Sequence, residues 1–429
     1  MSATTIIAIK ARRVWDSRGR PTLEADVTLE GGARGRAIAP AGASRGSREA
    51  VELRDGGTRF GGMDVLGAID QVNNAIANAL RGHDARDQVA ADLALIALDA
   101  TPNKAKLGGN ATVAVSLAIA HAAAAALEVP LWRYLANGDA VSLPLPQIQI
   151  FGGGAHAGRR IDIQDLMVMP IGAWTYSDAL AIAADVYRAA GELMAEAGKL
   201  GGVADEGGWW PQFASNEEAL EMLVRAIERA GLRPGEDAAI ALDIAASEFG
   251  RDGRYTLALD QRTLDRDAFA ELLLRWVERY PIRSIEDPFA EDDRVAWISF
   301  AREAPARLQI VGDDYLVTSA ALVDAAAIDH ACNAALIKVN QAGTLSEAHA
   351  ALAAARRAGF GAIVSARSGE SEDVSIAHLA VGWSAGQLKV GSFARSERMA
   401  KWNELLRIEE ESGGSAVFAG AAVLPDGKM

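Results

Sequence analysis

A repeating unit between residues 239 and 389 constrains the fold of this chain more than any other feature. Each unit is a short apolar run that ends in a polar residue and is followed by a loop and an amphipathic stretch. The runs are Ala239–Asp243, Ser284–Glu286, Gln309–Asp313, Ala335–Lys338, Ala362–Arg367 and Gln387–Lys389. Their polar ends lie 43, 27, 25, 29 and 22 residues apart, close to the length of one strand–helix unit. This spacing predicts a (β/α)8-type barrel, whose functional groups lie where the strands end.

A different pattern precedes the barrel. Between residues 5 and 55 apolar and polar residues alternate, most clearly from Thr22 to Leu29, and this predicts a small antiparallel sheet. From Val65 to Ala136 the chain is rich in Ala and Leu at helical spacing, which predicts packed helices. We therefore expect an α+β domain over residues 1–136 and a catalytic barrel over residues 143–429. The turn residues at Asn137–Asp139 and the prolines of Leu143–Pro146 predict the linker.

Composition excludes several classes of function. The net charge of -14 argues against nucleic acid as a main partner, because phosphate binding needs a basic face. The first residues have no apolar stretch of signal-peptide length, and no segment approaches the roughly 20 apolar residues that cross a bilayer, so we expect a cytoplasmic protein without a membrane partner. The single cysteine, Cys332, cannot form an internal disulfide, and the six histidines contain no His-x-x-x-His pair. Any metal is therefore expected to be a hard ion held by oxygen.

Three predicted strands in succession end in a carboxylate: Asp243, Glu286 and Asp313. Barrel closure would bring them around one point, where they would repel each other unless a cation neutralised them. Oxygen ligands select Mg²⁺ or a similar hard ion. Acids at strand ends can instead cap the following helices. The succession of three acids, followed by two lysines and an arginine, favours a metal site.

Two lysines end later strands. Lys338 follows the apolar run of "LIKVNQAGTL", and Lys389 lies two strands further on. A divalent cation disfavours the ammonium form of a nearby lysine, so its pKa falls and it can act as a general base. A metal bound to a substrate carboxylate would stabilise the enediolate that follows removal of the α-proton. Lys389 would add fixed positive charge.

Nearly the whole chain, from "WDSRGRPTLEADV" to "ARSERMAKWNELLRIEEE", resembles enolase (phosphopyruvate hydratase). The resemblance is carried by the motifs "VADEGGWWP", "IALDIAASEF", "SIEDPFAEDD", "IVGDD", "LIKVNQAGTLSE" and "RSGESED". It implies an enolase fold, with an N-terminal capping domain before the barrel, and a homodimer or higher homo-oligomer. A lysine base combined with Mg²⁺ is the established arrangement of enolase-superfamily sites.

The resemblance assigns roles at the metal and the reacting carbon. Asp243, Glu286 and Asp313 would hold the first Mg²⁺. Lys338 would be the base, and Lys389 would bind the substrate carboxylate.

It also assigns roles at the other groups of the substrate. Arg367 and Ser368 would bind the phosphoryl group, and Ser44 of "APAGASRG" would bind a second Mg²⁺ from a loop. Glu206 of "ADEGG" would help the β-hydroxyl leave. His156 of "GGGAHAG" matches a histidine of the second loop that covers the substrate.

The chain departs from enolase at the site itself. Ala366 stands where enolase has the His of Ser-His-Arg-Ser-Gly, and Asp165 stands where the family has Glu, which withdraws a carboxylate of the acid pair by about 1.5 Å. A shift of that size at a proton-transfer site can lower the rate on the order of a hundredfold. In the two covering loops, Arg45 replaces Thr, and Arg159 and Arg160 replace small or polar residues.

Single arginines in loops are usually drift, but together these changes predict a roomier and more cationic site. Such a site would suit a substrate larger and more anionic than 2-phosphoglycerate or phosphoenolpyruvate, because guanidinium groups pair with phosphoryl and carboxylate oxygens. The chain looks like the carboxyphosphonoenolpyruvate synthases of phosphonate biosynthesis, which join a nucleotide-activated phosphonoformate to an enolpyruvate skeleton. Two alternatives remain: an ordinary enolase, which converts 2-phosphoglycerate to phosphoenolpyruvate, and a non-catalytic enolase-like binding protein.

Overall fold

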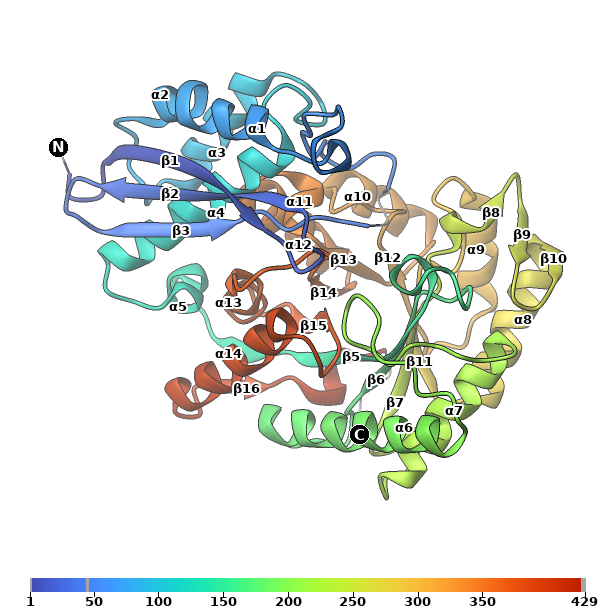
Figure 1. Ribbon diagram of the computed structural model, residues 1–429. Helices are drawn as coiled ribbons and strands as arrows, with labels where there is room; N and C mark the ends of the chain where they lie inside the picture. Colours follow the sequence, from blue (N-terminus) through green and yellow to red (C-terminus); the bar gives the residue numbers. More distant parts are fainter. Residues whose placement is uncertain (1, 44–45, 426–429) are drawn as a thin grey trace.

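The computed structural model describes residues 2–43 and 46–425. Figure 1 shows an N-terminal α+β layer, drawn in blue and cyan, beside a barrel that the rest of the chain forms. The helices α3 (Gln88–Asp99) and α4 (Gly109–Ala126) of the first layer pack against α11 (Val339–Ala342) and α12 (Leu345–Arg357) of the barrel. The two layers therefore share a packed interface.

The N-terminal layer contains the predicted antiparallel sheet. Its strands are β1 (Ile6–Trp15), β2 (Pro21–Leu29) and β3 (Arg34–Ile38), in the order β1-β2-β3. Leu23, Ala25 and Val27 of β2 are fully buried, as the alternating pattern predicts. Gly35 allows close packing on α4, because a Cβ at this position would lie 2.1 Å from the Ala118 carbonyl oxygen.

One of the predicted helices of this layer, α4, is unusually long and apolar. The helices are α1 (Leu66–Gln71), α2 (Ala77–Leu80), α3, α4 and α5 (Leu131–Ala136). By length and composition α4 could cross a membrane, contrary to our expectation that no segment approaches this limit. However, 83% of its 18-residue window is buried inside the protein. The helix is apolar because it lies in the core between the sheet and the barrel.

The predicted barrel is confirmed as a closed sheet of eight strands in the order β11-β12-β13-β14-β15-β5-β6-β7. Strands such as β7 are buried along their whole length, because both faces of a barrel strand are covered, and this explains the continuous apolar runs. The barrel strands are β5 (Leu145–Gly152), β6 (Asp165–Met169), β7 (Ala239–Asp243), β11 (Ile282–Glu286), β12 (Gln309–Gly312), β13 (Ala334–Ile337), β14 (Gly361–Ser365) and β15 (Gly386–Gly391).

Helices surround this barrel, and short strands extend it. The helices besides α11 and α12 are α6 (Tyr176–Glu196), α7 (Asn216–Arg229), α8 (Arg266–Arg279), α9 (Arg294–Glu303), α10 (Ala320–Asp329), α13 (Ser375–Gly382) and α14 (Ser396–Ser412). The short strands are β4 (Val141–Leu143), β8 (Gly250–Arg251), β9 (Arg254–Leu257), β10 (Arg262–Asp265) and β16 (Ala416–Phe418).

One barrel strand runs in the opposite direction to the others. β6 is antiparallel to both of its neighbours, β5 and β7, and its first residue, Asp165, pairs with the last residue of β7, Asp243. The start of β6 therefore lies at the same rim as the carboxyl ends of the parallel strands. This reversal brings Asp165 to the rim that carries the predicted site.

The predicted linker is only partly correct. Asn137–Asp139 is a turn outside the regular elements, but Leu143 ends β4, and Leu145 and Pro146 begin β5. The domain ranges 1–136 and 143–429 stay a prediction.

Candidate active site

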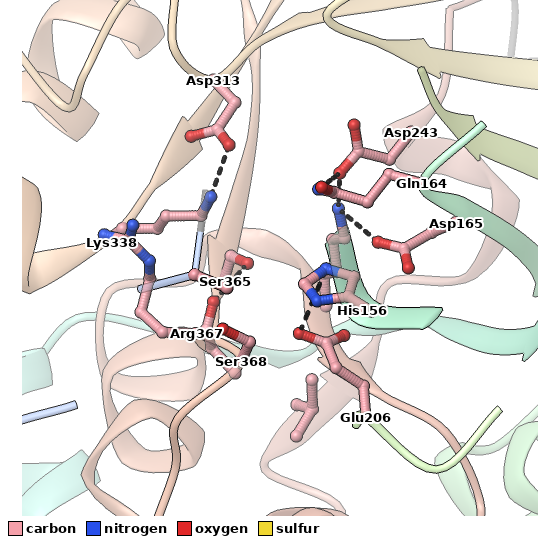
Figure 2. A pocket seen from close by; sticks show the side chains of 14 residues that line it. His156, Gln164, Asp165, Glu206, Asp243, Asp313, Lys338, Ser365, Arg367 and Ser368 are labelled. Carbon is pink, nitrogen blue, oxygen red and sulfur yellow. Dashed lines mark hydrogen bonds and ion pairs between the residues drawn. The ribbon is translucent and has the colours of Figure 1, made fainter. Parts of the chain in front are cut away.

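A small cavity of about 30 Å³ opens at the carboxyl ends of the parallel strands. Figure 2 shows side chains that line it at the rim of the barrel, and the N-terminal layer contributes Ala43. The described residues that line it are Ala43, His156, Gln164, Asp165, Glu206, Asp243, Asp313, Lys338, Ser365, Ala366, Arg367, Ser368, Lys389 and Val390. Most of the residues predicted from sequence therefore meet in one place.

Lys389 lies at the centre of three carboxylates. Its Nζ is 2.7 Å from Asp243 Oδ2, 2.8 Å from Glu286 Oε2 and 3.3 Å from Asp165 Oδ2. Burial alone would lower the pKa of Lys389, but the charges of Asp243, Glu286 and Asp165 raise it well above its usual value. In this structure the three carboxylates therefore hold Lys389 in its ammonium form.

Lys338 makes a separate ion pair across the cavity. Its Nζ pairs with Asp313 Oδ2, and Figure 2 shows the two side chains pointing toward each other. Thr318 Oγ1 accepts a hydrogen bond of 2.9 Å from the Lys338 backbone N–H, and Gln341 donates one of 2.9 Å to Asp313 Oδ1. These contacts hold the base candidate and its carboxylate in fixed positions.

The pKa of Lys338 does not fall in this arrangement. Burial has the largest single effect and lowers it, but the surrounding negative charges, chiefly that of Asp313, together raise the pKa above its ordinary value. A lower pKa requires a cation on Asp313, and in the structure Asp313 is paired with Lys338 itself. Lys338 becomes a usable base only when another positive charge takes over Asp313.

The donor set fits a hard divalent cation. Burial, followed by the charge of Asp243, raises the pKa of Glu286 well above its usual range, and Glu286 Oε1 is buried without a hydrogen-bond partner in the described part of the chain. Buried oxygen donors of this kind suit Mg²⁺. Asp243, Glu286 and Asp313 would hold it, and a bound Mg²⁺ would supply positive charge that stabilises an enediolate.

Three neighbouring acids, Asp287, Asp313 and Asp314, have carboxylate oxygens within 4.8 Å of one another, a spacing that the predicted trio Asp243, Glu286 and Asp313 does not show among the described residues. The Asp287 carboxylate accepts hydrogen bonds from the backbone N–H groups of Asp313 and Asp314, at 2.8 and 2.9 Å. Its carboxylate therefore orients the end of β12. Asp313 is the member of this cluster that reaches the cavity.

Arg367 and Ser368 lie at the side of the cavity opposite Asp165 in Figure 2. Both are buried, with 4% and 3% of their surface exposed. Arg367 Nη1 is 2.9 Å from Glu49 Oε2 and 3.1 Å from Asn340 Oδ1. Burial would lower the pKa of Arg367, but the charge of Glu49 raises it. This wall of the cavity is cationic and rigid.

Asp165 and Glu206, the two carboxylates of the acid pair, lie on the other side of the cavity together with His156. His156 Nε2 is 3.7 Å from Glu206 Oε1, and both side chains are buried. Asp165 accepts a hydrogen bond from Gln149 Nε2, and Gln149 Oε1 accepts one of 2.9 Å from the backbone N–H of Gly208. His156, Asp165 and Glu206 have ligand atoms within 4.8 Å of one another. Two carboxylates and an imidazole are thus close enough to exchange protons at a group bound between them.

Arg159 and Arg160 of the second covering loop do not line the cavity. The Arg159 side chain is 70% exposed and makes a 2.5 Å ion pair with Glu248, and Arg160 is also exposed. Ser44 and Arg45 lie outside the described residues. The structure therefore places two of the three new arginines at the surface.

Sequence reasoning missed several residues of the cavity and its wall. Gln164 donates a hydrogen bond of 3.0 Å to Asp243 Oδ2, and its position next to Asp165 was a usable signal. Glu49 binds Arg367 and also accepts from Gln341 at 3.2 Å. No local pattern marks Glu49, because it lies in a loop of the N-terminal layer.

Comparison with known families agrees with this geometry. The family model described as "Enolase, C-terminal TIM barrel domain" matches residues 140–426, and the one described as "Enolase, N-terminal domain" matches residues 6–135. The chain belongs to the enolase family. Its eight-stranded barrel and α+β N-terminal layer are the enolase fold. The family typically uses Mg²⁺ and acts on small phosphorylated acids, so this member is an enolase-superfamily lyase by family.

Proposed function

We propose that this enolase family member is a Mg²⁺-dependent enzyme that removes the α-proton of a 2-phosphoglycerate-like acid and forms an enolpyruvate. The specific activity proposed is that of a carboxyphosphonoenolpyruvate synthase. The observation that carries the proposal is the lining of one cavity, where Lys338 and the carboxylates are retained but Ala366 takes the place of an imidazole. The base and the carboxylates that would transfer protons are present. The wall at Ala366 is smaller than it would be with a histidine side chain.

Each residue has a role in this proposal. Lys338 would remove the α-proton, and its present partner Asp313 would be a ligand of the metal. Lys389, as an ammonium group, would bind the substrate carboxylate. Arg367 and Ser368 bind the phosphoryl group, where a guanidinium offers two parallel donors.

The β-hydroxyl end of the substrate would face the acid pair. Glu206 and His156 are positioned to protonate or orient a departing hydroxyl. Asp165 is drawn toward Lys389 at 3.3 Å and toward Gln149, so its short carboxylate lies in the wall. The shortened carboxylate of Asp165 and the small side chain of Ala366 are the features that favour a larger polyanion than 2-phosphoglycerate.

Arg159 and Arg160 would take part only after a movement, because both are exposed at the surface. Arg159 is paired with Glu248 at the surface, where an ion pair contributes about 0 to 1 kcal/mol. If a substrate phosphonate or phosphate replaces Glu248 as the partner of Arg159, the cost in free energy is therefore small. We assign Arg159, Arg160 and Arg45 to binding of an activated phosphonoformate, and Ser44 to a second Mg²⁺.

The proposal also includes the assembly and location of the protein. We expect a cytoplasmic homodimer or higher homo-oligomer, as the family resemblance implies. The net charge of -14 supports the absence of nucleic acid among its main partners.

The test is an assay of the purified protein with Mg²⁺ and 2-phosphoglycerate, with and without nucleotide-activated phosphonoformate, followed by phosphorus NMR. We expect slow formation of phosphoenolpyruvate and a new phosphonate signal only when both substrates are present. The double variant Ala366→His with Asp165→Glu should raise conversion of 2-phosphoglycerate and weaken use of the larger substrate. Ala366→Val is the matched control, because it fills space without an imidazole.

Two results would replace this proposal. Fast phosphoenolpyruvate formation that is indifferent to the double variant would identify an ordinary enolase, an alternative that the retained His156–Glu206 pair supports. No α-proton exchange with any phosphorylated three-carbon acid would identify a non-catalytic binding protein.

A further inference from the structure

A buried arginine of the N-terminal layer touches the phosphoryl side of the cavity. Arg18 lies in the turn between β1 and β2, and its side chain is 7% exposed. Its Nη1 donates a hydrogen bond of 3.1 Å to Ser368 Oγ, and its Nη2 donates one of 3.0 Å to the Ala41 carbonyl. Arg18 thus joins the N-terminal layer to the segment that carries Arg367 and Ser368.

Backbone contacts hold the same segment against the N-terminal layer. Ala41 and Gly369 exchange two N–H···O hydrogen bonds of 2.8 Å, and the Ser17 N–H donates to the Glu370 carbonyl at 2.7 Å. A Cβ on Gly369 would lie 2.4 Å from Arg18 Nη2 and 2.6 Å from Asp16 Oδ2. Only glycine at this position lets the arginine approach so closely.

Barrel residues hold the segment from the other side. Arg398, fully buried on α14, donates to the carbonyl oxygens of Arg367, at 2.6 Å, and of Ser368. Lys401, one turn further along the same helix, donates to the Ser371 carbonyl at 2.7 Å. These contacts hold the backbone of residues 367–371 in place, and the side chains of Arg367 and Ser368 line the cavity.

The contact with Arg18 determines the direction of the Ser368 hydroxyl. A guanidinium has only donors, so Ser368 Oγ must be the acceptor in the Arg18 contact. The hydroxyl proton has no acceptor in the described part of the chain, and Ser368 lines the cavity. The hydroxyl is therefore left to donate into the cavity, where an oxyanion would accept.

Arg18 also carries a poorly compensated charge. Asp16 Oδ2 lies 3.4 Å from its Nη2, and its Nε is buried without an acceptor among the described residues. Burial accordingly lowers the pKa of Arg18, despite the charge of Asp16. A charge with so few other acceptors strengthens the hydrogen bond that Arg18 donates to Ser368 Oγ.

We propose that Arg18 is a positioning residue that fixes the Ser368 hydroxyl as a hydrogen-bond donor to a phosphoryl or phosphonyl oxygen. The inference rests on the proposed function, in which Arg367 and Ser368 bind that group. It adds a residue of the N-terminal layer to the anion subsite and explains why the turn between β1 and β2 reaches the barrel rim.

The test is calorimetric titration of the full-length protein with inorganic phosphate in the presence of Mg²⁺. Ser368→Ala and Arg18→Met should each weaken phosphate binding about 10-fold, because each removes a hydrogen bond to a charged group. The double variant should bind phosphate no more weakly than whichever single variant has the lower affinity, since Arg18 acts through the Ser368 hydroxyl. Arg20→Met, an exposed arginine of the same turn, is the matched control and should bind like the wild type.

Arg18→Lys keeps the buried charge, and it provides the test if Arg18→Met does not fold. A single ammonium cannot replace both guanidinium contacts, so Arg18→Lys should weaken phosphate binding less than Arg18→Met and more than Arg20→Met. Effects of Arg18→Met and Ser368→Ala that simply add would overturn the inference.

The proposed function and this inference fail differently. If Arg367→Ala leaves phosphate affinity unchanged, the phosphoryl assignment fails, and the inference fails with it. If Arg367→Ala weakens binding but the Arg18 and Ser368 variants do not, only the role of Arg18 is wrong.

Discussion

Replacement of Lys338 by Ala should separate the base from the metal site. Lys338 comes from the end of β13, whereas Asp243 and Glu286 end β7 and β11, so the variant removes the amine and leaves those two carboxylates paired with Lys389. It also leaves Asp313 without the lysine that neutralises it. The variant therefore has two consequences, one for rate and one for stability.

The expected magnitudes follow from the structure. Loss of a general base costs about 100- to 10,000-fold in rate. Loss of one partner of a buried ion pair costs about 3 to 5 kcal/mol in the free energy of unfolding, and Asp313 is only 9% exposed at its side chain. Addition of Mg²⁺ should recover part of that stability, because the cation supplies the missing countercharge to Asp313.

The rate is measured as deuterium incorporation at the α-carbon of 2-phosphoglycerate in D₂O, and stability as denaturant unfolding with chelator and with Mg²⁺. Lys104 offers a matched control: it is also buried, and it pairs with Glu347 at 2.8 Å away from the cavity. Lys104→Ala should lose only about 1 kcal/mol of stability, because Glu347 is 35% exposed, and should leave exchange within about twofold of the wild type.

One result would refute this reasoning about the base. If Lys338→Ala exchanges the α-proton as fast as the wild type, the base lies elsewhere. Lys389 would then be the next candidate, although three carboxylates hold its pKa high. Equal stability of the variant with chelator and with Mg²⁺ would show that Asp313 is not a metal ligand.

Two further predictions concern metal dependence and the free cysteine. Removal of divalent cations by a chelator, or the substitution Asp313→Ala, should abolish turnover while the protein stays folded by circular dichroism; full activity with chelator would contradict the metal mechanism. Burial raises the pKa of Cys332 from 9.0 to about 12, so a thiol reagent such as Ellman's reagent should label it only after unfolding. Because its pKa is higher in the folded state, Cys332 should make the folded state less stable as pH rises from about 9 to about 12, and Cys332→Ala should remove that slope.

The barrel and the residues at its rim were predictable from the sequence. Strands covered on both faces must be apolar throughout, so each appears as a continuous run whose first polar residue marks the rim. Asp243, Glu286, Asp313 and Lys338 were each found in this way, at or one residue beyond the ends of β7, β11, β12 and β13. Their roles were not predictable from this pattern and came from the resemblance to enolase.

Contacts between distant parts of the chain were decided only by the tertiary structure. The Arg18–Ser368 hydrogen bond joins residues 350 positions apart, and the Glu49–Arg367 contact joins residues 318 apart. No local periodicity records such a pairing, because each partner lies in a loop. The reversal of β6, which brings Asp165 to the rim, is likewise a property of sheet pairing.

The choice of ion-pair partners was also decided in three dimensions. Sequence reasoning placed two lysines near three carboxylates, but only the distances across the barrel pair Lys338 with Asp313 and Lys389 with Asp243 and Glu286. These pairings set the direction of each pKa, because Coulomb energy depends on separation and burial, which residue order does not specify. Residue types and their spacing thus determined which charges gather at the rim, and the fold determined which of them neutralise one another.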